Sequence, residues 1–167
     1  FTVLADTLDF IVAHTIDGLN AGKRKDQIHA SVQLPEHLAN HPTMNVQYVT
    51  ANDISKMVIK KYTGWWDDIP SHWSPASMKA QGNMFIELAG DNLPTIITYA
   101  HGLIGQDIRL ASHLTDWLFY ARPNNREVQQ LVFDVYKARI MDPSTNTMEM
   151  LTYLDQMTAA RQRSRGK

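Results

Sequence analysis

Apolar residues recur at helical spacing along almost the whole chain, and no segment shows the alternating pattern of a β-strand. In the first stretch the apolar side chains stand at positions 4, 8, 11, 12, 16 and 19, close to the one-sided stripe of a half-buried helix. Gly22 and the basic run at 23–25 suit the C-terminal end of such a helix, since glycine ends helices and cations are favoured there. The periodicity therefore predicts an all-α fold.

The same periodicity predicts further helices, separated by breaks rich in proline, glycine and asparagine. Thr50 with Asp53 resembles a capping box, and Ser74 before Pro75 is typical of a helix start. The clearest amphipathic stripe lies between the breaks at 122–125 and 142–144. The other expected helices and helical turns lie at 4–22, 26–32, from 34 onward, and at 51–65, 75–89, 93–103, 108–121 and 147–161.

The 167 residues have the length of one domain, and we expect a single helical domain over 1–167. Within it we distinguish a helical first half at 1–90, helical hairpins at 91–161 and a basic tail at 162–167. The hairpins resemble tetratricopeptide stacking, but no period of about 34 residues can be aligned, so a multi-helix bundle is favoured. Because the chain opens at Phe1, we expect it to be a processed or excised piece of a longer polypeptide.

Charge and composition exclude several classes of function. Residues 1–160 contain 12 of the 16 Lys and Arg residues and all 17 Asp and Glu residues. A body this acidic is a poor surface for nucleic acid, so we expect no nucleic-acid partner. The absence of cysteine excludes disulfides, thiolate metal ligands and a cysteine nucleophile. No apolar run approaches about 18 residues, so we also expect no membrane span.

The seven histidines are the candidate metal ligands, and their spacing gives little support to a metal site. His37 and His41 are four residues apart, which on a helix places both imidazoles on one face. An asparagine and a proline flank His41, and no acidic ligand motif accompanies the pair, so a solvated loop is the favoured interpretation. We therefore expect no metal site and no cofactor in this chain.

Two His–carboxylate pairs have i, i+3 spacing: His14 with Asp17, and His113 with Asp116. Such pairs usually form structural hydrogen bonds across one helical turn. The chain lacks a Gly-x-Ser-x-Gly elbow, a phosphate loop and a dinucleotide fingerprint. The sequence thus supplies no constellation of catalytic residues.

The most unusual local feature is an aromatic cluster made of Tyr62, Trp65, Trp66 and Trp73. Three of the four tryptophans of the chain lie within nine residues. One interpretation is a core cluster that covers the end of a helix. The other is a protein interface or the wall of a substrate pocket, because Trp and Tyr combine a large apolar area with one hydrogen-bonding group. These four residues are the candidates for an interaction surface or pocket wall.

Five blocks, taken in their order along the chain, resemble the dimerisation domain of the alkyl sulfatases. The most specific block is Tyr-x-Gly-Trp-aromatic-Asp at 62–67. The similarity covers residues 7–160, which is nearly the whole chain. The blocks lie at residues 14–23, 34–38, 59–70, 113–117 and 121–125.

The resemblance implies a homodimer in which helices of the first half intertwine with those of an identical subunit. It also implies that a catalytic domain with the metallo-β-lactamase fold precedes this chain in the same polypeptide. Such an enzyme hydrolyses alkyl sulfate esters with water activated by two zinc ions, since zinc lowers the pKa of bound water. The metal motif of that family, His-x-His-x-Asp-His, is absent here, so this chain alone is expected not to be an enzyme. The family also implies a periplasmic or secreted bacterial location.

Two questions stay open at this point. The paired helices after Leu93 also suit a free-standing helical-repeat module that binds a peptide in a groove. In addition, residues 67–70 read Asp-Asp-Ile-Pro where the family usually has Asp-Gly-Asn-Pro, and residues 52–56 depart from the family pattern as well. The parent protein is accordingly a divergent sulfatase, a hydrolase of another ester or an inactive homologue.

Overall fold

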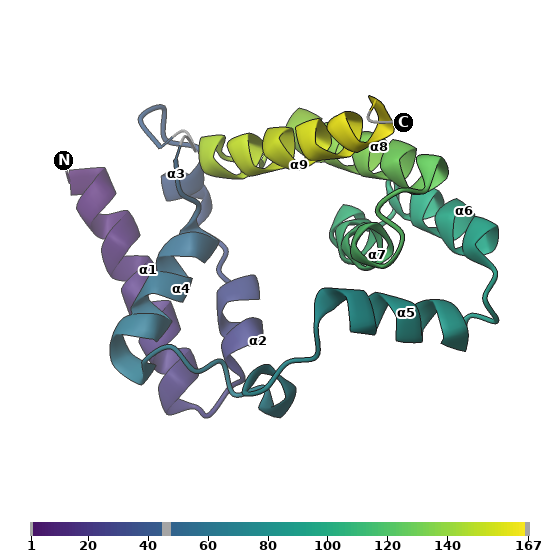
Figure 1. The fold of residues 1–167 in the computed structure, drawn as a ribbon. Coiled ribbons are helices and arrows are strands. Elements are labelled where there is room, and N and C mark those ends of the chain that lie inside the picture. Colours follow the sequence, from purple (N-terminus) through teal and green to yellow (C-terminus); the bar gives the residue numbers. More distant parts are fainter. Residues whose placement is uncertain (1, 45–47, 166–167) are drawn as a thin grey trace. The chain divides into compact units, whose positions relative to one another are not determined.

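The computed structural model describes residues 2–44 and 48–165, and within these ranges it contains helices and no strands (Figure 1). The predicted all-α fold is confirmed. The chain divides into two compact units, unit 1 over Phe1–Ser74 and unit 2 over Pro75–Lys167. The helices are α1 (Thr2–Asn20), α2 (Lys25–Ala30), α3 (Glu36–Ala39), α4 (Ala51–Thr63), the 3₁₀ turn η1 (Pro70–His72), α5 (Met78–Leu88), α6 (Leu93–Leu103), α7 (Ile108–Ala121), α8 (Arg126–Met141) and α9 (Thr147–Arg165).

Unit 1 is built around α1 and α4, which pack side by side, with α2 against both of them (Figure 1). Between α1 and α4 the Oγ1 of Thr15 and the Oγ of Ser55 form a buried hydrogen bond of 2.8 Å. The core of unit 1 is small, and it leaves much apolar surface exposed. Its buried apolar side chains are those of Ile11, Ile28, Leu38 and Ile59.

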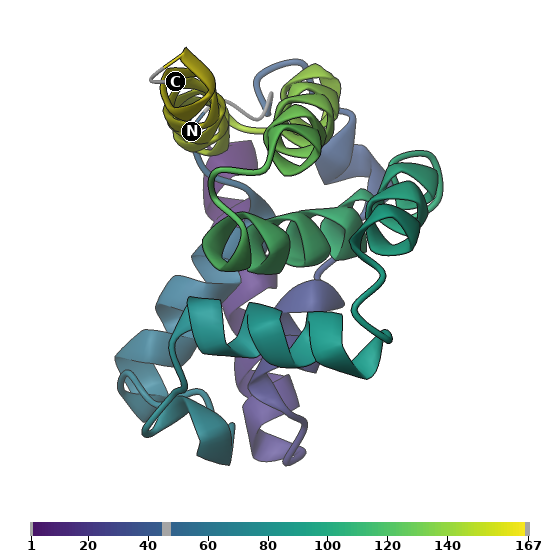
Figure 2. The same cartoon turned by 45° about the vertical axis from the view of Figure 1, so that its right-hand side comes forward.

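Unit 2 has a larger core, to which all five of its helices contribute. Helix α7 packs against α5, α6 and α8, and α9 lies along α8 (Figure 2). The stripe on α8 that the sequence predicts faces this core, and each of its residues is buried. These residues are Val128, Leu131, Val132, Val135 and Tyr136.

Side-chain caps determine where several helices begin. The predicted capping box is present, because Thr50 and Asp53 exchange the two hydrogen bonds that define it. The predicted start at Ser74 and Pro75 is wrong. Helix α5 begins only after Ser77, whose Oγ accepts a hydrogen bond from the third backbone N–H of the helix.

Helix α4 ends at Thr63, two residues before the predicted end. Gly64 follows with a φ of 79°, a left-handed conformation that glycine adopts without a steric penalty. Trp65 and Trp66 therefore leave the helix and belong to the loop between α4 and η1.

The boundary between the two compact units lies between Ser74 and Pro75. From the sequence, the boundary between the helical first half and the hairpins is expected at residue 90. Helix α5 belongs to unit 2 because it packs closely on α7. A Cβ atom on Gly82 of α5 would clash with the backbone carbonyl of Trp117 and lie 3.0 Å from the Cβ of Ala121. The structure confirms the multi-helix bundle, while the tetratricopeptide-like pairing of helices stays a prediction.

Part of the expected basic tail is helical, because α9 continues to Arg165. The guanidinium of Arg163 lies 4.9 Å from the ring centroid of Phe119, and this contact ties the end of α9 to α7. Residues 166 and 167 of the tail lie outside the described residues.

Candidate functional site

The three tryptophans of the aromatic cluster contact one another on the surface of unit 1. Their ring centroids are 5.8 Å apart for Trp65 and Trp66, 5.3 Å for Trp65 and Trp73, and 5.2 Å for Trp66 and Trp73. Trp65 and Trp73 are 68% and 66% exposed, and Trp66 is half-buried. We call Trp65, Trp66 and Trp73 the tryptophan surface. Tyr62 is exposed on the last turn of α4 and makes no ring contact with these residues in the described part of the chain.

The side chain of Lys25 anchors the loop that carries the tryptophan surface. Its Nζ donates a hydrogen bond of 2.5 Å to the backbone oxygen of Trp66 and lies 3.2 Å from Oδ2 of Asp68. Lys25 itself is buried at the start of α2. Asp68 has a φ of 69°, an uncommon conformation for a residue with a side chain, so the loop needs such an anchor. In the sequence, Lys25 belongs to a basic run that suits the C-terminal end of a helix dipole, and no local pattern marks its contact with the loop.

A second set of hydrogen bonds closes the turn between Trp66 and Trp73. Oδ1 of Asp67 accepts a hydrogen bond of 3.1 Å from the backbone N–H of Ile69, and Oδ2 lies 2.5 Å from Nδ1 of His72. The hydrogen bond from His72 is the main reason why the pKa of the Asp67 carboxyl lies below its ordinary value. The adjacent carboxylates of Asp67 and Asp68 therefore have different partners, Ile69 and His72 for the first and Lys25 for the second.

The expected hydrogen bonds within the two His–carboxylate pairs do not form. Nε2 of His14 lies 3.1 Å from the Oγ of Ser31, a residue beyond α2. Oδ1 of Asp116 accepts a hydrogen bond of 2.5 Å from the hydroxyl of Tyr136 on α8. In both cases a partner from a neighbouring helix or loop replaces the expected partner on the same helical turn.

The pair His37 and His41 does not share a helix face, because α3 ends at Ala39. Nδ1 of His41 instead lies 2.8 Å from the Oγ1 of Thr43. Throughout residues 2–44 and 48–165, no group of three or more His, Asp or Glu side chains is placed to hold a metal ion. None of the helices described in the structure is both long and apolar enough to cross a membrane.

Unit 1 has a small core and exposes tryptophans that pack against one another. Large exposed apolar patches mark interaction sites, so these features are typical of a domain that mediates association. Comparison with known protein families agrees with this class. A family model described as alkyl sulfatase dimerisation matches residues 24–163. The chain belongs to the alkyl sulfatase dimerisation family.

Individual relatives are similar to this chain over part of their length. The linear primary-alkylsulfatase of a Pseudomonas species is 23% identical over 113 residues, which cover 67% of this chain and 21% of the relative. The solved structure of a double mutant of the sec-alkyl sulfatase PisA1 has a TM-score of 0.81 at 23% identity, and the match covers 99% of this chain and 26% of that one. The structure of the stereoselective inverting sec-alkylsulfatase Pisa1 from Pseudomonas sp. has a TM-score of 0.80 at 21% identity, and the match covers 98% of this chain and 25% of that one. These structures share the fold, and this chain spans about a quarter of the length of the relatives.

Family membership confirms the resemblance seen in the sequence and supports the interpretation as a dimerisation domain. The alternative of a free-standing helical-repeat module is not favoured. The roles of Tyr62 and of the tryptophan surface at an interface or pocket wall stay a prediction.

Proposed function

We propose that this chain is the part of an alkyl sulfatase through which two identical subunits associate, with the tryptophan surface in their interface. The observation that carries the proposal is the exposure of Trp65 and Trp73 in a member of the dimerisation family. Tryptophan is enriched among the residues that dominate interface energies, because it buries a large area together with one hydrogen-bonding group.

Unit 1 exposes further apolar side chains that suit the same role. Leu4 and Leu8, one turn apart on α1, are 50% and 38% exposed, and Met57 on α4 is 59% exposed. In a two-fold dimer the same patch serves both subunits, so a modest area on each copy covers twice that surface. These side chains support self-association through unit 1.

For the complete polypeptide we propose a catalytic domain of the metallo-β-lactamase fold, upstream of this chain, that hydrolyses alkyl sulfate esters with two zinc ions. The alkylsulfatase names of the relatives support this proposal, as does the resemblance of the sequence blocks. Among the described residues of this chain no group of three or more potential ligand side chains is placed to hold a metal ion, and the proposal assigns the zinc ligands to the catalytic domain. A periplasmic or secreted bacterial location is proposed on the same resemblance.

Sedimentation velocity of the 167-residue chain across a range of concentrations tests the association. We expect a dimer at about 50 μM and weaker dimerisation in the Trp73→Ala variant, by about 30-fold or more in Kd. Trp73 is mostly exposed, so its replacement leaves the fold intact. Tyr99→Ala is the matched control, because Tyr99 is an aromatic residue of α6 in unit 2 with 61% exposure.

Two outcomes contradict the proposal. A strictly monomeric chain at about 50 μM removes self-association as the function of this piece. A Trp73→Ala variant that dimerises as well as Tyr99→Ala removes the tryptophan surface from the interface.

A further inference from the structure

Helices α1 and α4 of unit 1 pack side by side and run in the same direction (Figure 1). They carry opposite charges, since α1 contains three aspartates and no lysine or arginine, whereas α4 contains three lysines and one aspartate. In the aspartate of α4, Oδ1 of Asp53 lies 3.7 Å from Nζ of Lys56 on the same helix. Within the described residues no ion pair joins α1 to α4, so the charges of the two helices do not pair inside one copy.

Asp9 and Lys61 stand at opposite ends of this helix pair. The hydrogen bond between Thr15 and Ser55 places these two residues at the same level. Asp9 lies six residues before Thr15, and Lys61 lies six residues after Ser55, so the two charges are equally far from this contact. At a rise of about 1.5 Å per residue they are about 18 Å apart along the helix axes, too far to pair within one copy. Both are exposed, and neither side chain has an ion-pair or hydrogen-bond partner in the described part of the chain.

These two charges border apolar side chains that unit 1 does not fully cover. Such an arrangement is typical of the rim of a protein interface, where charged groups stay partly solvated around an apolar centre. The apolar neighbours within one helical turn are Leu8 (38% exposed) and the half-buried Val12 for Asp9, and Met57 (59% exposed) and the half-buried Val58 for Lys61.

Asp9 and Lys61 also point away from the interior of unit 1. A Cβ atom on Gly18 of α1 would lie 2.9 Å from Cγ1 of Ile28, so Gly18 faces α2. At about 100° per residue, Asp9 lies about 180° round α1 from Gly18. Lys61 lies about 160° round α4 from the buried Ile59. Another protein can therefore reach both side chains.

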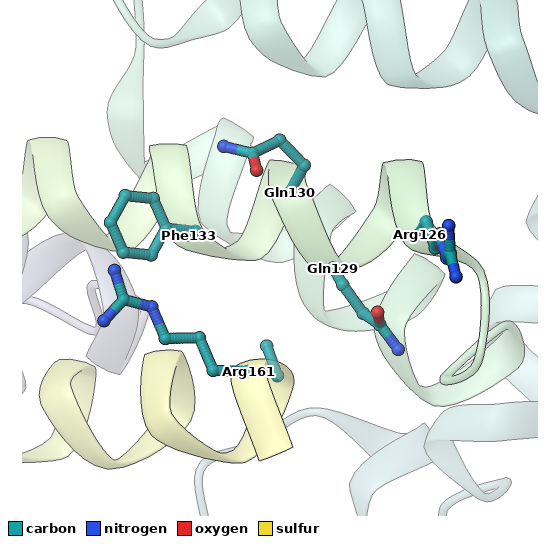
Figure 3. A pocket seen from close by; sticks show the side chains of 6 residues that line it. Arg126, Gln129, Gln130, Phe133 and Arg161 are labelled. Atoms are coloured by element: carbon teal, nitrogen blue, oxygen red, sulfur yellow. The ribbon is translucent and has the colours of Figure 1, made fainter. Parts of the chain in front are cut away.

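The pocket of unit 2 lacks this balance of charge. It has a volume of about 290 Å³ and lies between α8 and α9 (Figure 3). Arg126 and Arg161 line it, and no aspartate or glutamate is among the described residues that do so. A surface that pairs with its own copy through charges needs both signs, so the surface of α1 and α4 fits a second copy and this pocket does not.

We propose, on the basis of the proposed association through unit 1, that Asp9 of one copy pairs with Lys61 of a second copy. A two-fold axis that crosses the line from Asp9 to Lys61 at its midpoint and at right angles exchanges the two positions. Each dimer therefore contains this ion pair twice. Charges at the rim of an interface select the orientation of the partner more than they add affinity, so the two pairs fix the register of the dimer.

Charge reversal tests the pair, with sedimentation velocity of the 167-residue chain at about 50 mM NaCl as the measurement. We expect Asp9→Lys and Lys61→Glu each to weaken dimerisation by about tenfold in Kd, because two like-charge contacts replace two attractive ones. The double variant restores opposite charges and is expected to dimerise within about threefold of the unchanged chain.

Lys60→Glu is the matched control for Lys61→Glu. It makes the same change of charge at an exposed neighbour that lies about 100° further round α4. We expect it to change Kd by less than about twofold. Circular dichroism melting checks that each variant folds.

Two results overturn the pair: a double variant that dimerises no more tightly than the single variants, and equal dimerisation of Lys61→Glu and Lys60→Glu. The proposed association fails separately. A chain that is monomeric at about 50 μM overturns both the association and the pair. A chain whose dimer depends on Trp73 but shows no rescue by charge reversal overturns the pair alone.

Discussion

The ammonium group of Lys25 donates a hydrogen bond of 2.5 Å to the backbone oxygen of Trp66, 41 residues further along the chain. The same group lies 3.2 Å from the carboxylate of Asp68. Because Trp65 and Trp73 are mostly exposed, burial of their rings within unit 1 contributes little to their placement. A polar contact from α2 thus positions the tryptophan surface.

Lys25→Met keeps the apolar stem of the side chain and removes the ammonium group. We expect a loss of about 1–2 kcal/mol in the free energy of unfolding, because a charged hydrogen bond is lost while the exposed Asp68 stays solvated. Tryptophan emission should change as the loop is released, and urea unfolding measures the stability. Lys23→Met, an exposed neighbour, is the matched control. Identical behaviour of the two variants contradicts the role assigned to Lys25.

The buried hydroxyl pair of Thr15 and Ser55 suits a double-mutant cycle. Thr15 also donates to the backbone oxygen of Ile11 at 2.7 Å, so its own proton is engaged and the hydrogen bond between the hydroxyls uses the proton of Ser55. We expect Thr15→Val to cost about 1–2 kcal/mol, since it leaves the buried Ser55 hydroxyl without its partner.

Adding Ser55→Ala to Thr15→Val should recover part of that loss, because both polar groups are then replaced by apolar ones. Chemical denaturation of the two single variants and the double variant gives the coupling free energy. Strict additivity of the two costs contradicts an energetic link between α1 and α4 through these hydroxyls.

Gly82→Ala tests the close approach of α5 to α7. The new methyl group meets the backbone carbonyl of Trp117, which cannot move without shifting α7, so we expect a loss of about 2 kcal/mol or more. Gly102→Ala in α6 is the control, because no heavy atom other than those of its chain neighbours and the backbone of its own helix lies within 4 Å of the added Cβ. This control should stabilise the chain by up to about 1 kcal/mol through helix propensity. Equal thermal midpoints for the two variants contradict the packing described for α5.

Local sequence patterns predict a helix well where one residue type determines its end or one period determines its buried face. The stripe on α8 and the capping box of Thr50 and Asp53 each depend on residues within a few positions of one another. The sequence predicts the wrong start for α5, because Ser74 with Pro75 and Ser77 offer competing caps and only the packing of the helix decides between them.

Contacts between distant segments could not be predicted in the same way. Lys25 lies in a basic run that looks like an ordinary helix end, and its partner is a backbone atom without any signature in the sequence. The buried Oε1 of Gln129 likewise depends on how α8 and α9 come together. The aromatic cluster is visible in the sequence because its composition is unusual, but its exposure follows from the turn at Gly64.

The hydrogen bond from Tyr136 to Asp116 leads to a prediction for the pH dependence of stability. Burial raises the pKa of the Asp116 carboxyl above its ordinary value of 3.8, although Tyr136 and His113 both act in the opposite direction. The folded state therefore binds the proton of the Asp116 carboxyl more tightly than the unfolded state does. As a result, the contribution of Asp116 to the free energy of unfolding falls as the pH rises from 3.8 through the pKa of the folded state. Asp116→Asn keeps an oxygen acceptor for Tyr136 but cannot ionise. We expect its free energy of unfolding, relative to the unchanged chain, to increase between about pH 3.5 and pH 7 in urea titrations, and a difference that is constant or decreases over this range contradicts the prediction.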